Sequence, residues 1–394
     1  METAFMLTHD QLIDISKALE DRVEDGLKTD GQEVRCLLTY VPATDEIKSN
    51  RAIVLDLGGT NVRSAVLRIE NEKAIIEKGP EEAILPIQRG VPLEKKKFLD
   101  VQANLIQNLN PESGLPLGYC FSYPTRSTYE GDAELLNWTK EVVIPDTVGH
   151  NVGKMLLDHM KTDVISCKHA VVINDTIASL FSGLTLNRVD ANIGLIVGTG
   201  TNMAMFIDSK RAQKLSSDLN WSGEIPVNLE SGNFNPPHLN HYDEIVDAQS
   251  ENPGSQIFEK AVSGAYLGRI LKAVFPKSAY DSDFGSRGVV EIAYNSDNSS
   301  IEARVARNIL SRSAQLVAAS LAGLLHLIAT TKSVETARIM AEGSLFWKAP
   351  GYSDEVKKTL NSLIEKMDIP NIKVEIRSIE NANLIGSAIA ALVK

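Results

Sequence analysis

Two stretches of the chain repeat one pattern: an apolar run of strand length, a short turn rich in glycine and threonine, and a second apolar run. The first stretch surrounds the turn at 56–61 (DLGGTN), and the second surrounds the turn at 198–202 (GTGTN). Apolar runs bounded by glycine predict strands joined by tight turns. The sequence therefore predicts two strand–turn–strand units whose turns can face one another across a cleft.

Glycine turns of this kind have two interpretations. Their backbone N–H groups and threonine hydroxyls can point at phosphate oxygens, but similar residues also form plain β-hairpin turns. Neither turn matches the G-x-x-x-x-G-K-[ST] phosphate loop or the G-x-G-x-x-G spacing of a dinucleotide site. The pair therefore favours a triphosphate held from both sides, and it disfavours a dehydrogenase or a standard P-loop nucleoside triphosphatase.

The rest of the chain alternates strand and helix patterns, which predicts an α/β protein. Further strands are expected at 170–173 and 337–341. Long helices are expected at 256–275 and 301–331, and a closing helix at 385–393. Because no low-complexity linker separates these segments, the motifs alone indicate where one domain ends and the next begins.

Composition and charge exclude several classes of protein. The 394 residues carry 40 Lys+Arg against 51 Asp+Glu, a net charge of −11 that argues against a nucleic-acid backbone as the main partner. Cys36, Cys120 and Cys167 lie outside any C-x-x-C spacing, so neither a disulfide framework nor a zinc site is indicated, and a reducing cytoplasm is the expected location. The first ten residues lack a secretory signal pattern. The apolar run at 316–329 is interrupted and too short to span a bilayer, so a buried helix is expected.

Asp175 is the first candidate for a catalytic group. It ends the apolar run at 170–173, where α/β proteins place functional side chains, and Asn174 and Thr176 flank it. A carboxylate in this position can act as a general base for phosphoryl transfer. The same residue could instead cap the helix expected at 177–184, and local sequence does not separate the two interpretations.

Three side chains are candidate ligands of a metal site: His238, His241 and Asp243. His238 follows two prolines in a polar loop, and no further histidine cluster supplies a third imidazole. The sequence therefore predicts no metal bound by the protein itself.

Taken in order, the motifs resemble the hexokinase family, within the actin-like, sugar-kinase and Hsp70 group of ATPases. The resemblance runs from about residue 36 to the end of the sequence. The segments that carry it are LDLGGTNVR (55–63), LGYCFSYP (117–124), NWTK (137–140), VGHNV (148–152), VVINDT (171–176), IGLIVGTGTN (193–202), NLESGNF (228–234), SQIFEKAVSGAYLG (255–268) and AEGSLF (341–346).

The resemblance assigns roles residue by residue. It implies that Asp175 is the general base and that Lys140 assists catalysis. The hexose site would comprise Ser122, Thr139, Lys140, Asn174, Asp175, Asn202, Glu230, Gln256 and Glu259. The ATP and phosphate site would comprise Asp56, Gly58, Gly59, Thr60, Asn61, Arg63, Gly198, Thr199, Gly200, Thr201, Gly343, Ser344 and Leu345. Mg²⁺ would arrive with the nucleotide, as Mg-ATP.

The implied fold is the two-lobed actin-like ATPase (ribonuclease H-like) fold, with mixed sheets flanked by helices and the active-site cleft between the lobes. The small lobe is expected at 51–173 plus 380–394. The large lobe is expected at 1–50 plus 174–379. Closure of the lobes over the sugar would exclude water.

The implied function is ATP-dependent phosphorylation of the 6-hydroxyl of glucose or a related hexose such as mannose or fructose, the first step of hexose entry to glycolysis. One alternative is a catalytically weak sensor that binds hexose and ATP. Another is an actin-like or chaperone ATPase without a sugar substrate, which the NWTK and VVINDT segments and the two segments that carry Glu230 and Glu259 disfavour. The expected partners are small molecules, with no nucleic acid and no membrane, and the chain would act as a monomer or homodimer in the cytoplasm.

The chain departs from the family pattern in places. Residues 141–143 (EVV) follow the NWTK segment where the family has glycine and an aromatic residue, and Ser231 replaces tryptophan. Near the adenosine, Glu342 stands where the family has aspartate. Sugar preference and regulation are the properties that these departures affect.

Overall fold

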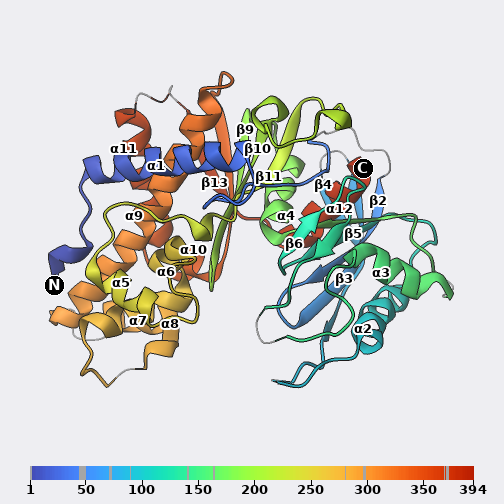
Figure 1. Cartoon of the computed structure of the whole chain (residues 1–394), viewed down its shortest axis with the longest axis horizontal. Helices are drawn as coiled ribbons and strands as arrows, with labels where there is room; N and C mark the ends of the chain where they lie inside the picture. Colours follow the sequence, from blue (N-terminus) through green and yellow to red (C-terminus); the bar gives the residue numbers. More distant parts are fainter. Residues whose placement is uncertain are drawn as a thin grey trace.

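The computed structural model describes residues 2–43, 50–70, 73–88, 90–139, 142–162, 165–279, 281–295, 299–367, 369 and 372–394. Within these ranges the protein has two main β-sheets and helices packed around them (Figure 1). The α/β class predicted from the alternating patterns is therefore confirmed.

The two main sheets share one topology, as the repeated pattern predicts. In each, three antiparallel strands are followed along the chain by two strands parallel to the first. The five-stranded sheet has the order β4 (Lys73–Ile84), β3 (Asn61–Glu70), β2 (Arg51–Leu57), β5 (Leu117–Phe121), β8 (Ala170–Ile173). The six-stranded sheet has the order β1 (Leu37–Leu38), β11 (Glu224–Asn228), β10 (Thr201–Asp208), β9 (Ala191–Val197), β12 (Thr336–Glu342), β13 (Lys373–Arg377). Its one further strand is β1, antiparallel at its edge. A small hairpin joins β6 (Thr125–Ser127) to β7 (Ala133–Leu135).

The helices pack on both sides of these sheets (Figure 1). The α-helices are α1 (His9–Lys28), α2 (Lys95–Asn108), α3 (Val152–His159), α4 (Asp175–Ser182), α5 (His241–Ala248), α6 (Ile257–Val262), α7 (Gly264–Val274), α8 (Gly285–Asn295), α9 (Ile301–Ala329), α10 (Ser344–Lys348), α11 (Tyr352–Lys366) and α12 (Ala382–Val393). The 3₁₀ helices are η1 (Glu2–Phe5), η2 (Met160–Thr162), η3 (Gly183–Thr185), η4 (Ser209–Arg211), η5 (Ser217–Leu219), η6 (Ser231–Asn233) and η7 (Ser282–Phe284).

Helices α4 and α12 lie between the two sheets and pack against each other (Figure 1). Helix α4 contacts strands of both sheets, and α12 contacts strands of the five-stranded sheet. Their close approach depends on glycine. A Cβ at Gly386 of α12 would lie 1.8 Å from the carbonyl oxygen of Ala178, and a Cβ at Gly194 of β9 would lie 2.6 Å from that of Thr176. Since neither space admits a side chain, these two glycines set the position of α4, whose first residue is Asp175.

Helix α9 (Ile301–Ala329) confirms the long helix predicted at 301–331 and contains the apolar run at 316–329. Among the described residues, it is the one helix whose length and apolar composition would suffice to cross a membrane. Within the fold, 83% of its apolar window is buried, and α1, α8 and α11 pack against it. In this structure it is therefore a core helix.

The single helix predicted at 256–275 is wrong, because the chain breaks into α6 and α7 at Ser263, which has extended backbone angles. At the break, the N–H group of Gly264 donates to the carbonyl oxygen of Gly198 at 2.7 Å instead of continuing the helix. A Cβ at Gly264 would lie 2.7 Å from that same oxygen. Contact with a distant turn, which helical periodicity does not reveal, therefore interrupts the helix.

Candidate active site

The carboxyl ends of β2, β5 and β8 form one edge of the five-stranded sheet. These strands are parallel neighbours, with Leu57 opposite Phe121 and Cys120 opposite Ile173. Asp56, Ser122 and Asn174 therefore lie at the same edge, although more than a hundred residues separate the first from the last. The N–H group of Ser122 donates to the carbonyl oxygen of Leu57 at 3.1 Å, which joins two of these strand ends.

The side chain of Cys120 lies near both acidic residues of this edge, Asp56 and Asp175. Its side chain is buried, and burial raises the pKa of the thiol well above its usual value. The negative charges of Asp56 and Asp175 raise it further, because an anion disfavours a second anion nearby. The two carboxylates thus lie close to one side chain, and the structure brings together a predicted phosphate residue and the predicted base.

Asp175 is the first residue of α4, and Asn174 is the N-cap of that helix. The Oδ1 of Asn174 accepts a hydrogen bond from the N–H of Thr176 at 2.9 Å, so the capping role belongs to Asn174. Asp175 accepts from the same N–H at 2.8 Å and from the Thr176 hydroxyl at 3.3 Å. These bonds orient its carboxylate at the positive end of the helix dipole, where an anion is stabilised.

The first glycine turn joins β2 to β3 and is held by backbone bonds. Gly58 donates to the carbonyl oxygen of Asn61 at 3.1 Å, and the carbonyl oxygen of Thr60 accepts from Leu85 at 2.8 Å. The hydroxyl of Tyr123 donates to the carbonyl oxygen of Gly59. With its carbonyl groups bound in this way, the turn is a rigid element beside the carboxyl edge of the sheet.

Asp56 and Arg63 form an ion pair at the base of this turn. The Arg63 guanidinium contacts Asp56 Oδ2 at 2.6 Å and donates to Asn381 Oδ1 at 3.3 Å. The amide of Asn383 lies 3.4 Å from Asp56 Oδ1. Because Asn381 precedes α12 and Asn383 lies in its first turn, these bonds attach the first glycine turn to the C-terminal helix.

The second glycine turn joins β9 to β10 and meets the end of β12. Gly198 donates to the carbonyl oxygen of Gly200 at 2.9 Å, and Ala265 donates to that of Thr199 at 3.1 Å. Gly343 has a φ of 113°, and a Cβ there would lie 2.2 Å from the carbonyl oxygen of Val197. Gly343 and the turn therefore pack backbone to backbone, and the predicted residues Gly198 and Ser344 become neighbours.

Predicted hexose residues of the six-stranded sheet form one hydrogen-bonded network. The Asn202 amide donates to Asn228 Oδ1 at 2.7 Å, and the Asn228 amide donates to Glu230 Oε1 at 2.9 Å. Ser231, which replaces the family's tryptophan, donates its N–H to Asn202 Oδ1 at 3.2 Å. Asn228 was not predicted, although it starts the NLESGNF segment and links the two predicted residues.

Glu259 connects the hexose residues to the second glycine turn. Its Oε2 accepts the N–H of Thr201 at 3.0 Å, and a Cβ at Gly200 would lie 2.7 Å from the same oxygen. A glycine at position 200 is thus required for the carboxylate to lie against the turn.

Glu230 and Gln256 both have left-handed backbone angles, with φ of 56° and 54°. Residues other than glycine adopt this conformation at some energetic cost, and they concentrate at functional sites. The carbonyl oxygen of Phe234 accepts from the N–H of Phe258 at 2.8 Å, which joins the loops that carry Glu230 and Gln256. Two separate segments of the predicted hexose site therefore form one surface.

Lys140, the predicted assistant in catalysis, lies outside the described residues. Thr139 is half-buried, and its carbonyl oxygen accepts the N–H of Val142 at 3.2 Å. Within the described part of the chain, no side-chain hydrogen bond joins Thr139 to the other predicted hexose residues. The roles of Thr139 and Lys140 stay predictions.

A cavity of about 440 Å³ lies beside the second glycine turn, lined by Ser344 and Leu345 and by residues of α8. Ser286, Arg287, Val290 and Glu291 supply the α8 wall. These four residues were not predicted, because the segment has no glycine–threonine or carboxylate motif that would single it out. Only the packing of α8 against α7 and α9 places them here.

The three residues considered as a metal site, His238, His241 and Asp243, do not form one in the structure. His238 contacts Asp14 at 3.1 Å, and both carboxylate oxygens of Asp243 bind Arg312 at 2.7 Å. Among the residues that the structure describes, no group of three or more His, Cys, Asp or Glu side chains could hold a metal ion.

Glu342, the residue that replaces the family's aspartate, is the basis of a pH-dependence prediction. Burial raises the pKa of its carboxyl group to about 7, although Arg63 and the N–H of Ile379 oppose the shift. The folded chain then keeps a proton that the unfolded chain releases near pH 4.5, so stability falls as the pH rises from about 4.5 through about 7.

Replacing Glu342 with glutamine removes this titration. We expect the melting temperature of Glu342→Gln, relative to the native protein, to increase as the pH rises from 5 to 8. Melting curves at pH 5, 6.5 and 8 check the trend. A difference in melting temperature that stays constant across these pH values would contradict it.

Comparison with known proteins agrees with this geometry. Models of the hexokinase family match residues 1–184, 192–294 and 277–393. Hexokinase-2 of Solanum tuberosum is 34% identical over 290 residues, which cover 69% of this chain and 58% of the relative. Hexokinase-2 of Arabidopsis thaliana is 34% identical over 292 residues, covering 70% and 57% respectively. The chain thus spans less than two thirds of the length of these relatives.

A solved structure shares the fold. The hexokinase from Schistosoma mansoni complexed with glucose matches with a TM-score of 0.80 and 22% sequence identity, over 100% of this chain and 97% of that one. The two-lobed actin-like arrangement predicted from the motifs is therefore confirmed. Because the family models match most of the chain and the plant relatives exceed 30% identity, this protein belongs to the hexokinase family.

Proposed function

We propose that this protein is an ATP-dependent hexokinase that transfers the γ-phosphate of Mg-ATP to the 6-hydroxyl of glucose or a related hexose. The observation that carries the proposal is the position of Asp175. Its carboxylate lies at the edge where β2, β5 and β8 end, near Asp56 of the first glycine turn and within electrostatic reach of Glu230. A proton acceptor thus lies between residues suited to phosphate and residues suited to sugar.

The hexose would bind chiefly to amide and carboxylate side chains. Asn174, Asn202, Glu230 and Glu259 supply several acceptors and donors, which suits a pyranose because each of its hydroxyls needs a partner. A site of buried polar groups also discriminates strongly against analogues that lack a hydroxyl, since the unpaired group is then left buried.

The phosphates would lie between the two glycine turns. The backbone N–H groups of Gly59, Thr60, Thr199 and Gly200, with the positive charge of Arg63 beside the first turn, can stabilise charge on the transferring phosphoryl group. Those of Gly58, Gly198 and Thr201 are bonded within the protein. Mg²⁺, bound to the nucleotide, would neutralise phosphate charge. The adenosine would enter the 440 Å³ cavity beside Ser344 and Leu345.

In the chemical step, the oxygen of the 6-hydroxyl would attack the γ-phosphorus while Asp175 accepts the hydroxyl proton. The bond from the γ-phosphorus to the β–γ bridging oxygen would break, and ADP would leave. Closure would bring Ser122, Thr139 and Lys140 over the sugar and exclude water. We propose that the moving units are 51–173 with 380–394 and 1–50 with 174–379, and that the enzyme works in the cytoplasm. We do not favour the sensor, because both glycine turns and Asp175 are intact.

The test is ADP production by the purified protein with Mg-ATP and glucose, mannose, fructose or 6-deoxyglucose. We expect at least one of the three hexoses to drive turnover, and we expect 6-deoxyglucose, which lacks the hydroxyl to be phosphorylated, to drive none. ADP release at one rate with and without sugar would instead indicate a chaperone-like ATPase. Hexose binding without ADP production would indicate a sensor.

A further inference from the structure

The segment at 33–38 runs antiparallel beside the loop that carries Glu230. Leu37 pairs with Asn228, and the N–H of Cys36 donates to the carbonyl oxygen of Leu229 at 3.2 Å. Further along, Glu33 Oε1 accepts the N–H of Asn235 at 2.6 Å. Arg35 directly precedes Cys36 and Glu230 directly follows Leu229, so the hydrogen bond between Cys36 and Leu229 places Arg35 beside Glu230.

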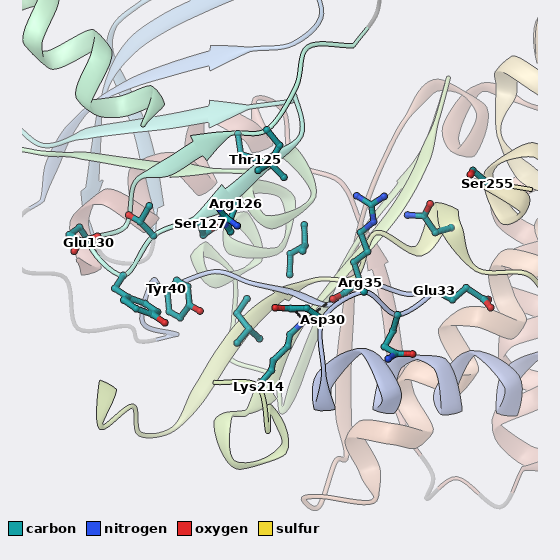
Figure 2. A pocket seen from close by; sticks show the side chains of 18 of the residues that line it. Asp30, Glu33, Arg35, Tyr40, Thr125, Arg126, Ser127, Glu130, Lys214 and Ser255 are labelled. Atoms are coloured by element: carbon teal, nitrogen blue, oxygen red, sulfur yellow. Dashed lines mark hydrogen bonds and ion pairs between the residues drawn. The ribbon is translucent and has the colours of Figure 1, made fainter. Parts of the chain in front are cut away.

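Arg35 lines a cavity of about 930 Å³ that adjoins the hexose residues. Asn233 and Ser255, which also line it, lie three residues after Glu230 and one before Gln256. Figure 2 shows the Arg35 side chain extending from its segment into this cavity, with Thr125 and Arg126 on the opposite side. The guanidinium therefore lies in the cavity beside the predicted hexose site.

The other two cations of the cavity have partners. Lys214 contacts Asp30 at 2.9 Å and the carbonyl oxygen of Arg35 at 2.8 Å, and Arg126 contacts Glu134 at 2.8 Å. Within the described ranges, the Arg35 guanidinium has neither a hydrogen bond nor an ion pair. Of the three cationic side chains Arg35, Arg126 and Lys214, Arg35 is therefore the one that forms no ion pair with a carboxylate of the described residues.

The Glu230 carboxyl group needs a compensating charge. Burial raises its pKa, and the negative charge of Asp175 raises it further, whereas the Asn228 amide and Arg35 lower it. The carboxyl group of Glu259, on α6, also lies close to η6 but is bound to the N–H of Thr201. Arg35 is therefore the cation that favours the anionic form of Glu230.

We propose that Arg35 is a positioning residue of the hexose site, whose guanidinium keeps the Glu230 side chain an anion that accepts hydrogen bonds from sugar hydroxyls. The inference rests on the proposed hexokinase function and adds a residue from outside the hexose motifs. A carboxylate accepts from donors on both oxygens, whereas a protonated carboxyl group must place one O–H as a donor. Loss of the guanidinium therefore weakens hexose binding most where Glu230 begins to protonate.

The test compares Arg35→Gln and Arg35→Lys with the native protein from pH 5.5 to 8.5, measuring kcat and the hexose KM. For Arg35→Gln we expect the KM to rise about three- to tenfold at the acidic end and to approach the native value at the alkaline end, because one pKa unit corresponds to a tenfold change in the protonation equilibrium. The kcat should stay within about twofold. Arg35→Lys should restore most of the binding, because it keeps the positive charge.

Two controls separate charge from general damage. Arg126→Gln removes a cation of the same cavity that is already paired with Glu134, and it should leave the KM unchanged at every pH. In a Glu230→Gln background, adding Arg35→Gln should change the KM no further, because no carboxyl group remains to titrate.

The outcomes are distinguishable. If the native protein turns over no hexose, the proposed function fails. If the native protein is active and Arg35→Gln keeps the native KM at all pH values, the Arg35 inference alone is overturned. An equal loss at every pH that Arg35→Lys does not rescue also overturns it, since that result would indicate a structural role.

Discussion

Replacing Asp175 with asparagine is expected to lower kcat by about 10²–10⁴-fold, the usual contribution of a positioned general base. Asparagine keeps the size of the side chain and an oxygen that can accept from Thr176, so α4 should begin in the same place. It cannot take the proton of the 6-hydroxyl. The hexose KM should therefore change far less than kcat, a split that steady-state kinetics with Mg-ATP measures directly.

A matched control is Asp158→Asn, which alters an exposed carboxylate of α3 paired with Lys154 at 2.7 Å. It should leave kcat unchanged. If Asp175→Asn kept more than a tenth of the native kcat with hexose bound, Asp175 would not be the base, and its main contribution would be its hydrogen bonds to Thr176.

Replacing Arg312 with alanine is expected to destabilise the protein by about 3–5 kcal/mol, because it leaves a buried carboxylate without its partner. Arg312 is 1% exposed, and its guanidinium binds both oxygens of Asp243 at 2.7 Å. It also lies over the ring of Phe5, with its central carbon 4.8 Å from the ring centroid. The pair joins α9 to α5 and η1, so chemical denaturation should show a lower midpoint.

Two comparisons test this explanation. Arg304→Ala removes an exposed arginine of the same helix, paired with Glu2 at 2.8 Å, and should change stability by less than about 1 kcal/mol. The double variant Arg312→Met with Asp243→Leu should be more stable than Arg312→Ala, because it leaves no isolated charge. A double variant at least as unstable as Arg312→Ala would show that the uncompensated charge is not the cause.

Sequence motifs identified much of the site because its key residues follow strands or form turns. The glycine-rich turns at 56–61 and 198–202 follow apolar runs, and Asp175 follows a strand whose apolar character is plain in the sequence. Such signals are local, so they can be read without knowing the partners. The roles of Lys140 and Thr139, by contrast, came from the family resemblance and still await a test.

Long-range contacts explain what the motifs did not reveal. The break between α6 and α7 depends on Gly198, which lies more than sixty residues before it. The pKa of Glu342 depends on burial and on Arg63, a residue of the other sheet. Neither partner can be identified from periodicity, because periodicity describes a segment and not what packs against it.

The sequence by itself determined the α/β class, the two strand–turn–strand units, and the polar residues that follow their strands, because glycine turns and apolar runs act through local backbone and burial preferences. Only the tertiary structure decided which of these residues meet. Parallel pairing brings Asp56, Ser122 and Asp175 to one edge, and the hydrogen bond from Cys36 to Leu229 places Arg35 beside Glu230. The physical reason is that strand register is set by hydrogen bonds between segments far apart in the chain.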